Sequence, residues 1–335
     1  MPLTVRSFAK INLGLCIGPA RPDGFHELRT VYQTIALHDT LRVSVLKAKT
    51  GIEIICADPR VPTDASNTCY RIAERVLDAL KVKARVVIEI EKHLPVQGGL
   101  GGASANAVAV LQALEIVLKK RLSGDDRLRI AAEVGSDLPL FLVGGTVLGV
   151  GRGEQVYPLP DLPAMPCVIA VPEVGVSTPK AFADWDRLHD ARIGDSKLTP
   201  APASDRIIEF GRTISAWLSG VRRNSGGSVA GAPARSRGRV ENPLLSLVHA
   251  GIANDFEQVV FPQHPELREI KSALERAGAL YASLSGSGSA LYGLFATRAA
   301  AEKAAGTLVK RGIPAHATTT LTRHEYRGKF LVSQS

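Results

Sequence analysis

Four glycines at positions 98, 99, 101 and 102 separate a predicted strand from a predicted helix. Residues 85–91 have strand character, and apolar side chains then recur at helical spacing at Ala107, Val110, Leu111, Leu114, Val117 and Leu118. Glycine has no Cβ, so the backbone can adopt positive φ and approach a ligand closely, while the first N–H groups of a helix have no intrahelical partners. This order of elements predicts a phosphate-binding loop at the start of a helix.

The loop does not match the two commonest phosphate-binding patterns. No Gly-Lys-Ser/Thr follows it, as a Walker loop requires, and Ser104 stands where a dinucleotide fingerprint has its third glycine. A tight strand-to-helix turn without a ligand is the alternative interpretation. A second glycine-rich element, 283–290, precedes the strand-like residues 291–295. The two elements together could enclose a triphosphate from both sides in a site between two lobes.

The length of 335 residues allows two lobes, each with its own core. Besides 85–91, strands are predicted at 41–46 and 51–56, and helices at 67–80 and 205–218, so the chain is of mixed α and β type. The proline-rich stretch 158–166 predicts a domain boundary, with an N-terminal domain at 1–157 and a C-terminal domain at 158–335. Residues 219–239 are rich in Gly, Ser, Ala and Pro, and they are predicted to form a disordered insertion.

Composition excludes several classes of function. The net charge is +9, and five of the arginines lie in the insertion 219–239. The insertion is therefore interpreted as a solvated basic loop, and no nucleic-acid partner is predicted. The four cysteines form no C-x-x-C pair, which predicts neither a zinc site nor a disulfide framework. No apolar run approaches the ~20 residues of a membrane span, and the first residues lack signal-peptide character, so a cytoplasmic protein is expected.

Six separated segments carry recognisable motifs: Phe8–Leu13, Arg21–Leu28, Thr30–Gln33, Leu94–Asn106, Gly135–Pro139 and Leu284–Gly288. Together they resemble the motifs of the GHMP kinase family, and most closely its branch that acts on 4-diphosphocytidyl-2-C-methyl-D-erythritol. The resemblance covers nearly the whole chain, and the D-G-F-H-E-L motif at 23–28 is not shared by other GHMP kinases. The resemblance implies two α+β lobes, the first ribosomal-protein-S5-like and the second ferredoxin-like, with the active site between them.

The resemblance also implies an activity: transfer of a phosphoryl group from ATP to the 2-hydroxyl of that cytidyl alcohol, in the non-mevalonate isoprenoid pathway. Asp137 matches the catalytic base of the family and Lys10 its partner at the reacting hydroxyl. Phosphoryl transfer requires positioning and charge neutralisation, and an alcohol needs an acceptor for its proton. Without the resemblance, Asp137 could cap a helix and Lys10 could be a surface lysine.

Further residues match positions that bind the nucleotide, ATP with Mg²⁺. The resemblance places Asn67 and Lys92 near the adenosine, and Ser104 is the candidate hydroxyl ligand for the metal ion. The full nucleotide-binding set is Asn67, Lys92, Pro95, Val96, Gln97, Gly98, Gly99, Leu100, Gly101, Gly102, Ala103, Ser104, Ala105, Gly286, Ser287 and Gly288.

Another set matches the binding site for the cytidyl substrate. His26 is the expected reader of the base, because an imidazole can both donate and accept at a pyrimidine edge. Aromatic rings can stack on the base. The full set is Asn12, Phe25, His26, Tyr32, Thr178 and Phe182. The partners are thus two small molecules, and a monomer or weak homodimer is expected.

The chain departs from the family pattern within the glycine loop. Gln97 and Ala103 replace glycines, and Ala105 replaces a serine that could contact phosphate or metal. Phe25 replaces a tyrosine. Two alternatives therefore stay open: a GHMP kinase for another alcohol, such as homoserine or mevalonate, and a nucleotide-binding module of this fold that has lost catalysis. Retention of both Lys10 and Asp137 favours an active enzyme.

Overall fold

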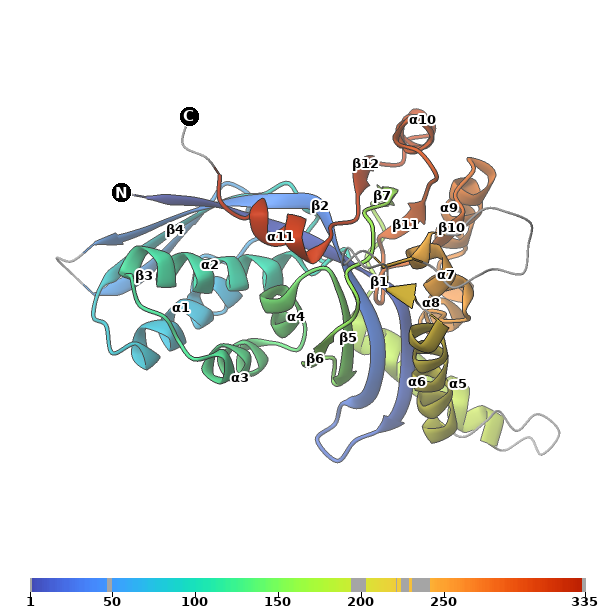
Figure 1. Cartoon of the computed structure of the whole chain (residues 1–335), viewed down its shortest axis with the longest axis horizontal. Coiled ribbons are helices and arrows are strands. Elements are labelled where there is room, and N and C mark those ends of the chain that lie inside the picture. Colours follow the sequence, from blue (N-terminus) through green and yellow to red (C-terminus); the bar gives the residue numbers. More distant parts are fainter. Residues whose placement is uncertain are drawn as a thin grey trace.

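Two β-sheets organise the chain (Figure 1). The computed structural model describes residues 2–46, 50–193, 203–220, 222–223, 229–230 and 242–332. The first sheet has the order β3-β4-β2-β5-β6, with β1 paired to β2, and the second has the order β10-β11-β7-β12. The strands of the first sheet are β1 (Leu3–Ala20), β2 (His26–Leu46), β3 (Gly51–Cys56), β4 (Arg85–Glu91), β5 (Thr146–Gly151) and β6 (Gln155–Pro158).

In the described part of the chain, the first sheet packs against four helices, of which the apolar spacing of the sequence predicted the first two. They are α1 (Thr68–Ala79), α2 (Gly102–Leu118), α3 (Gly124–Val134) and α4 (Leu138–Val143). Val86, Ile88 and Ile90 of β4 share one buried cluster with Val110 and Leu114 of α2. Helix α1 connects β3 to β4, which run parallel, and the other pairings in this sheet are antiparallel. Strand β4 ends at Glu91, and the glycine loop follows it in the chain.

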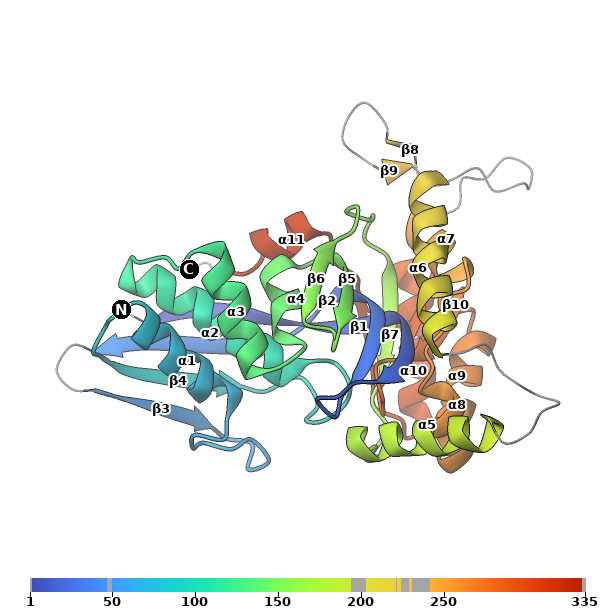
Figure 2. The same cartoon turned by 90° about the horizontal axis from the view of Figure 1, so that it is seen from below.

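The second sheet has the ferredoxin-like order that the family resemblance implies. Its first strand in sequence, β7, lies between the last two, β11 and β12, and all its pairings are antiparallel. Figure 2 shows helices around this sheet, well apart from the helices of the first. The elements are β7 (Pro166–Ala170), α5 (Thr178–Ile193), α6 (Ala203–Gly220), α7 (Pro243–His249), α8 (Glu257–Gln263), α9 (Pro265–Arg276), β10 (Tyr281–Leu284), β11 (Leu291–Leu294), α10 (Arg298–Lys310) and β12 (Ala315–Thr319).

The long hairpin of β1 and β2 joins the two halves. Val5 and Leu41 lie in the core of the first sheet, whereas Leu15 and Ile17 pack in a core of the second. The sequence analysis recognised only residues 41–46 of this hairpin as a strand. The rest of the hairpin was not predicted as strand, because residues 7–18 are buried without alternation. A strand covered on both faces lacks the period of two by which strands are recognised in a sequence.

The last described residues return to the first sheet. Helix α11 (Arg323–Gly328) places the Tyr326 hydroxyl 2.6 Å from the carbonyl oxygen of Phe141, and Leu331 forms a bridge to Val5. The domain division at 157 and 158 thus stays a prediction. The predicted insertion 219–239 lies mostly outside the described residues: Ser219 and Gly220 end α6, and only short β8 (Arg222–Arg223) and β9 (Val229–Ala230) follow within it. Within the described part of the chain, no helix is long and apolar enough to cross a membrane.

Candidate active site

The two glycine-rich elements are in direct contact. The amide of Ala290 donates to the carbonyl oxygen of Gly98 at 3.2 Å, and the Ser285 hydroxyl donates to the carbonyl oxygen of Gly99 at 3.0 Å. Gly99 has a φ of +73°, and a Cβ there would lie 2.2 Å from the Ser285 carbonyl oxygen. Only glycine fits this close approach. The residues that the sequence analysis grouped as one phosphate site are therefore adjacent in space.

The N-terminus of α2 is open to a ligand. Gly101 occupies the N-cap position with a φ of +70°, no side chain caps the helix, and its first turn contains no acidic residue. Uncapped N–H groups and the positive end of the helix dipole favour an anion at this position. Gly102, Ala103 and Ser104 of the first turn line a cavity of about 400 Å³, which is called the first cavity below.

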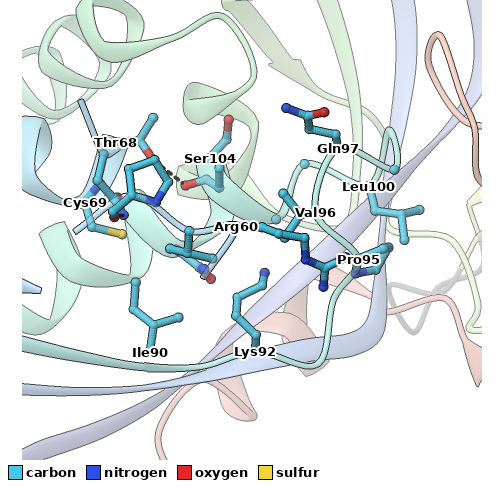
Figure 3. A pocket seen from close by; sticks show the side chains of 18 of the residues that line it. Arg60, Thr68, Cys69, Ile90, Lys92, Pro95, Val96, Gln97, Leu100 and Ser104 are labelled. Atoms are coloured by element: carbon cyan, nitrogen blue, oxygen red, sulfur yellow. Dashed lines mark hydrogen bonds between the residues drawn. The ribbon is translucent and has the colours of Figure 1, made fainter. Parts of the chain in front are cut away.

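The first cavity is bounded by β4, the segment before α1, the glycine loop and the start of α2 (Figure 3). Its lining includes most of the predicted nucleotide residues: Asn67, Lys92, Pro95, Val96, Gln97, Gly98, Gly99, Leu100, Gly101, Gly102, Ala103 and Ser104. Ala105 is not among them, since it is buried in the core of the first sheet. The serine that it replaces would therefore sit at a position facing the core. The lining also holds Arg60, Val61, Pro62, Ser66, Thr68, Cys69, Ile90 and Asn106, which the sequence analysis did not single out.

Asn67 and Lys92 are both held by other protein groups. Asn67 caps α1, accepting from the Cys69 amide at 2.8 Å and donating to the Pro62 carbonyl oxygen at 2.6 Å. The Lys92 ammonium lies 2.5 Å from Asp39, a fully buried carboxylate that the sequence analysis missed. Asp39 also accepts from the amides of residues 93 and 94 and from the Asn106 side chain. It thereby anchors the entrance of the glycine loop and keeps Lys92 beside Gly102.

Gln97 adopts the left-handed conformation, with a φ of +62°. This geometry explains why glycine suits the position, because a side chain here costs roughly 1–2 kcal/mol. We predict that Gln97→Gly raises the free energy of unfolding by about 0.5–1 kcal/mol, since relief of strain exceeds the added unfolded-state entropy. Urea unfolding would measure the change. Gln97→Ala, which removes the exposed side chain and keeps the strain, should give no gain, and equal gains in both variants would contradict the argument.

A second cavity, of about 610 Å³, lies on the other side of the glycine loop. Gly99 and Gly101 line both cavities, so a group held by the loop borders the two. The second cavity brings together residues from distant parts of the chain, among them all the predicted substrate and catalytic positions: Lys10, Asn12, Phe25, His26, Tyr32, Asp137, Thr178 and Phe182. Gly286 and Ser287 of the second glycine-rich element also line it, whereas Gly288 lines neither cavity.

Asp137 and Lys10 face each other at one end of the second cavity. Asp137 occupies the N-cap position of α4, but its side chain makes no capping hydrogen bond. Instead one oxygen lies 3.7 Å from the Lys10 ammonium, and the other accepts from the Tyr32 hydroxyl at 3.1 Å. The carboxylate is about one-third exposed. It is thus oriented toward the cavity and remains open to a ligand.

Lys10 is a buried cation held in place by polar neighbours. Its ammonium donates to Asn12 Oδ1 at 2.6 Å, and Asn12 donates in turn to the Thr30 hydroxyl at 2.8 Å. Both ends of the Asn12 amide are therefore occupied, which indicates that Asn12 orients Lys10. Burial lowers the pKa of Lys10, although the charge of Asp137 opposes this shift. The Lys10 backbone amide also donates to the carbonyl oxygen of Leu100, in the glycine loop, at 3.0 Å.

Aromatic residues gather at the other end of the second cavity. The rings of His26 and Phe182 are stacked with centroids 5.0 Å apart, and Phe256 meets Phe182 edge to face. His26 Nε2 lies 2.7 Å from Asp186 Oδ1. Because a carboxylate oxygen accepts, this contact gives Nε2 the proton and leaves Nδ1 as the second polar atom of the ring. Phe25 is 50% exposed.

The predicted substrate residues do not share one role in the structure. Tyr32 is nearly fully buried and lies at the Asp137 end, and burial beside Asp137 raises its pKa well above the usual range. The Thr178 hydroxyl lies 2.7 Å from that of Ser287, so it links α5 to the second glycine-rich element. Among the lining residues that sequence reasoning missed are Leu15, Gly24, Leu28, Ser136, Arg152, Pro179, Ala183, Asp186 and Phe256. Gly24, Leu28 and Ser136 lie within motifs that match the family, although they were not assigned to the site, and no local pattern marked the others.

This arrangement suits phosphoryl transfer to an alcohol. One cavity ends on uncapped helix N–H groups, the other holds a carboxylate and an ammonium, and the glycine loop borders both. An anionic phosphate at the loop would therefore meet an acceptor hydroxyl in the second cavity. Positioning and charge neutralisation are the main requirements of this reaction.

Comparison with known proteins supports this chemistry. The model of the GHMP kinases N terminal domain matches residues 67–145, and that of the GHMP kinases C terminal domain matches residues 240–313. The chain is 41% identical over 295 residues to a 4-diphosphocytidyl-2-C-methyl-D-erythritol kinase from Solibacter usitatus, with 88% of this chain and 81% of the relative covered. It is 35% identical over 300 residues to the enzyme of that name from Acaryochloris marina, with 89% of each covered.

Comparison with solved structures gives the same family. A 4-(cytidine 5'-diphospho)-2C-methyl-D-erythritol kinase superimposes with a TM-score of 0.67 and 28% identity over 95% of this chain and 99% of that one. A homoserine kinase from Cytophaga hutchinsonii has the same TM-score at 23% identity, over 96% of this chain and 95% of that one, and shows the shared fold alone. The motifs, the two-sheet architecture and these likenesses agree that the chain belongs to the GHMP kinase family, in its branch of 4-diphosphocytidyl-2-C-methyl-D-erythritol kinases.

Proposed function

We propose that this chain transfers the γ-phosphoryl group of ATP to the 2-hydroxyl of 4-diphosphocytidyl-2-C-methyl-D-erythritol, giving the 2-phosphate and ADP. The observation that carries the proposal is the pairing of two cavities across one glycine loop, with Lys10 and Asp137 on the acceptor side. The relatives named above carry this enzyme's name at 41% and 35% identity over most of the chain. The similarity to a homoserine kinase structure does not indicate which alcohol is the acceptor, since it reflects the shared fold alone.

Asp137 acts as the proton acceptor in the proposed mechanism. An alcohol loses its proton as it attacks phosphorus, and a carboxylate within hydrogen-bond reach can accept that proton. Tyr32 and Lys10 hold the two Asp137 oxygens in place, and the Lys10 ammonium neutralises charge that develops on the transferred group. The loop amides and the α2 N-terminus bind the phosphate oxygens.

The nucleotide is proposed to bind as its Mg²⁺ complex. The described residues contain no group of three His, Cys, Asp or Glu side chains that could hold a metal ion. The phosphates would therefore supply most ligands, and the Ser104 hydroxyl, in the first turn of α2, fits as a protein ligand. When bound, Mg²⁺ would neutralise charge on the β- and γ-phosphates.

A coupled assay of ADP formation tests the proposal. The purified chain should consume ATP with 4-diphosphocytidyl-2-C-methyl-D-erythritol and not with homoserine or mevalonate. Turnover with either of the other alcohols would reassign the acceptor. No turnover with any of the three, together with measurable ATP binding, would indicate a nucleotide-binding module. We further expect a cytoplasmic enzyme without a nucleic-acid partner, working as a monomer or weak homodimer.

His26→Ala tests the binding of the base. His26 is 8% exposed and stacks on Phe182 in the second cavity, away from the first. We predict that the variant raises KM for the cytidyl substrate at least ~10-fold, as loss of a ring contact and a hydrogen bond implies, and leaves KM for ATP within ~2-fold. Steady-state kinetics with each substrate varied would measure both. His316→Ala, on the exposed face of β12, is the matched control, and unchanged kinetics in His26→Ala would refute the assignment.

A further inference from the structure

Two cationic side chains, Lys10 and Arg152, line the second cavity. Lys10 faces Asp137 at 3.7 Å, and His26 faces Asp186 at 2.7 Å. The remaining charged side chain in the lining is Arg152. The Lys10 ammonium already donates to Asn12 Oδ1 at 2.6 Å, so Arg152 is the cation of the lining that retains free donors for a ligand, as the next contacts show.

Arg152 is held by its backbone, while its guanidinium is left open. It follows Gly151, the last residue of β5, in the turn to β6, and its amide donates to Glu154 Oε2 at 2.6 Å. The Nε atom lies 3.8 Å from Glu154 Oε1, which is too long for a hydrogen bond. Among the described residues, no hydrogen bond from the guanidinium itself is found. The turn thus fixes the base of the side chain and leaves the donors at its end for a ligand.

The guanidinium lies over the ring of Phe25, with its carbon 4.9 Å from the ring centroid. Phe25 precedes His26 in the turn that ends β1 and begins β2, so this contact places the cation next to the base-binding end of the cavity. Asp23 lies in the same turn and pairs with Arg21 at 3.3 Å. Asp23 thus binds Arg21, and Glu154 accepts from the Arg152 backbone amide, so neither nearby acid accepts a hydrogen bond from the Arg152 guanidinium.

The chemistry of this side chain suits a diphosphate. Arginine presents a planar set of donors that matches two phosphate oxygens, and it remains charged throughout the physiological range. The proposed substrate has a diphosphate between its base and its alcohol. A molecule that spans from His26 to Asp137 must therefore place that diphosphate in the middle of the second cavity, where its negative charges need a partner.

We propose that Arg152 binds the diphosphate of the cytidyl substrate and so contributes to selection of a diphosphate-linked acceptor over small alcohols that lack this group. The inference rests on the proposed function and deepens it. Small acceptors such as homoserine offer no diphosphate for this side chain, so the contact favours the larger substrate alone.

Arg152→Gln tests the inference, because the side chain is about 30% exposed and its loss should not prevent folding. KM for 4-diphosphocytidyl-2-C-methyl-D-erythritol should rise at least ~10-fold, as expected for loss of a charge-assisted hydrogen bond, whereas kcat and KM for ATP should stay within ~3-fold. Arg152→Lys should recover part of the loss. Arg42→Gln removes an equal charge from an exposed position on β2 outside both cavities, and it should leave every constant unchanged.

Competitive inhibition separates the diphosphate from the base. Against the cytidyl substrate at saturating ATP, cytidine diphosphate should inhibit Arg152→Gln at least ~10-fold more weakly than it inhibits the wild type, while inhibition by cytidine should not change. An equal loss for both inhibitors, or no loss for either, would overturn the role of Arg152 while leaving the proposed function intact. A wild-type chain that turns over no cytidyl substrate would instead refute the proposed function.

Discussion

Asp137→Asn is expected to lower kcat by at least ~100-fold, the loss that follows removal of a positioned proton acceptor. The amide keeps the volume of the side chain and can still accept from the Tyr32 hydroxyl, which lies 3.1 Å from the carboxylate. It cannot accept a proton from the substrate. Because Asp137 lines only the second cavity, KM for ATP should change by less than ~3-fold. Steady-state kinetics with ATP and the cytidyl substrate would measure both constants.

Two further variants serve as controls for this result. Tyr32→Phe removes the hydrogen bond to Asp137 and leaves its charge, so kcat should fall by less than ~10-fold. Asp125→Asn changes an exposed carboxylate in the first turn of α3, outside both cavities, and should have no effect. Near-normal turnover in Asp137→Asn would remove this carboxylate from the proton transfer, whatever the other variants do.

Gly99→Ala should damage both the fold and the nucleotide site. An added Cβ would lie 2.2 Å from the Ser285 carbonyl oxygen and 3.0 Å from that of Gly288, at a backbone φ of +73° that disfavours alanine. Both neighbours are backbone atoms of the second glycine-rich element, so they cannot move aside as a flexible side chain would. We expect a loss of about 2–4 kcal/mol in the free energy of unfolding from the strained conformation and the overlap.

The same substitution should raise KM for ATP at least ~10-fold, because displacement of the loop would move the amides that we propose bind the phosphates. Urea unfolding and steady-state kinetics would measure the two effects. Gly124→Ala is the matched control, since a Cβ there meets nothing within 4 Å and the residue begins α3. A variant that loses stability but keeps the KM of the wild type for ATP would show that the loop does not bind the nucleotide.

Local features of the fold could be predicted because they depend on neighbouring residues. Strand β4 spans the predicted residues 85–91, and α1 lies within the predicted helix 67–80. The apolar spacing after the glycine loop correctly indicated α2. The hairpin of β1 and β2 was recognised only in part, since its burial on both faces removes the alternation on which strand prediction depends.

The partners of individual charged residues could not be predicted. Asp39, Asp186 and Arg152 are single residues outside the glycine-rich pattern, and each gains its role from a partner far away in the sequence. Asp39 meets Lys92, 53 positions later, and Asp186 meets His26, 160 positions earlier. A periodic pattern carries no information about such contacts.

The sequence by itself determined which groups are available for the proposed reaction: a glycine loop before a helix, a carboxylate and a lysine, in motifs that resemble the GHMP kinases. Only the tertiary structure decided that these groups meet. It brings Lys10 of β1, Asp137 at the start of α4 and Gly286 from the second sheet to one cavity. The reason is physical. Residue types and local periodicity set which elements form, whereas the contacts between distant elements depend on how the whole chain buries its apolar surface.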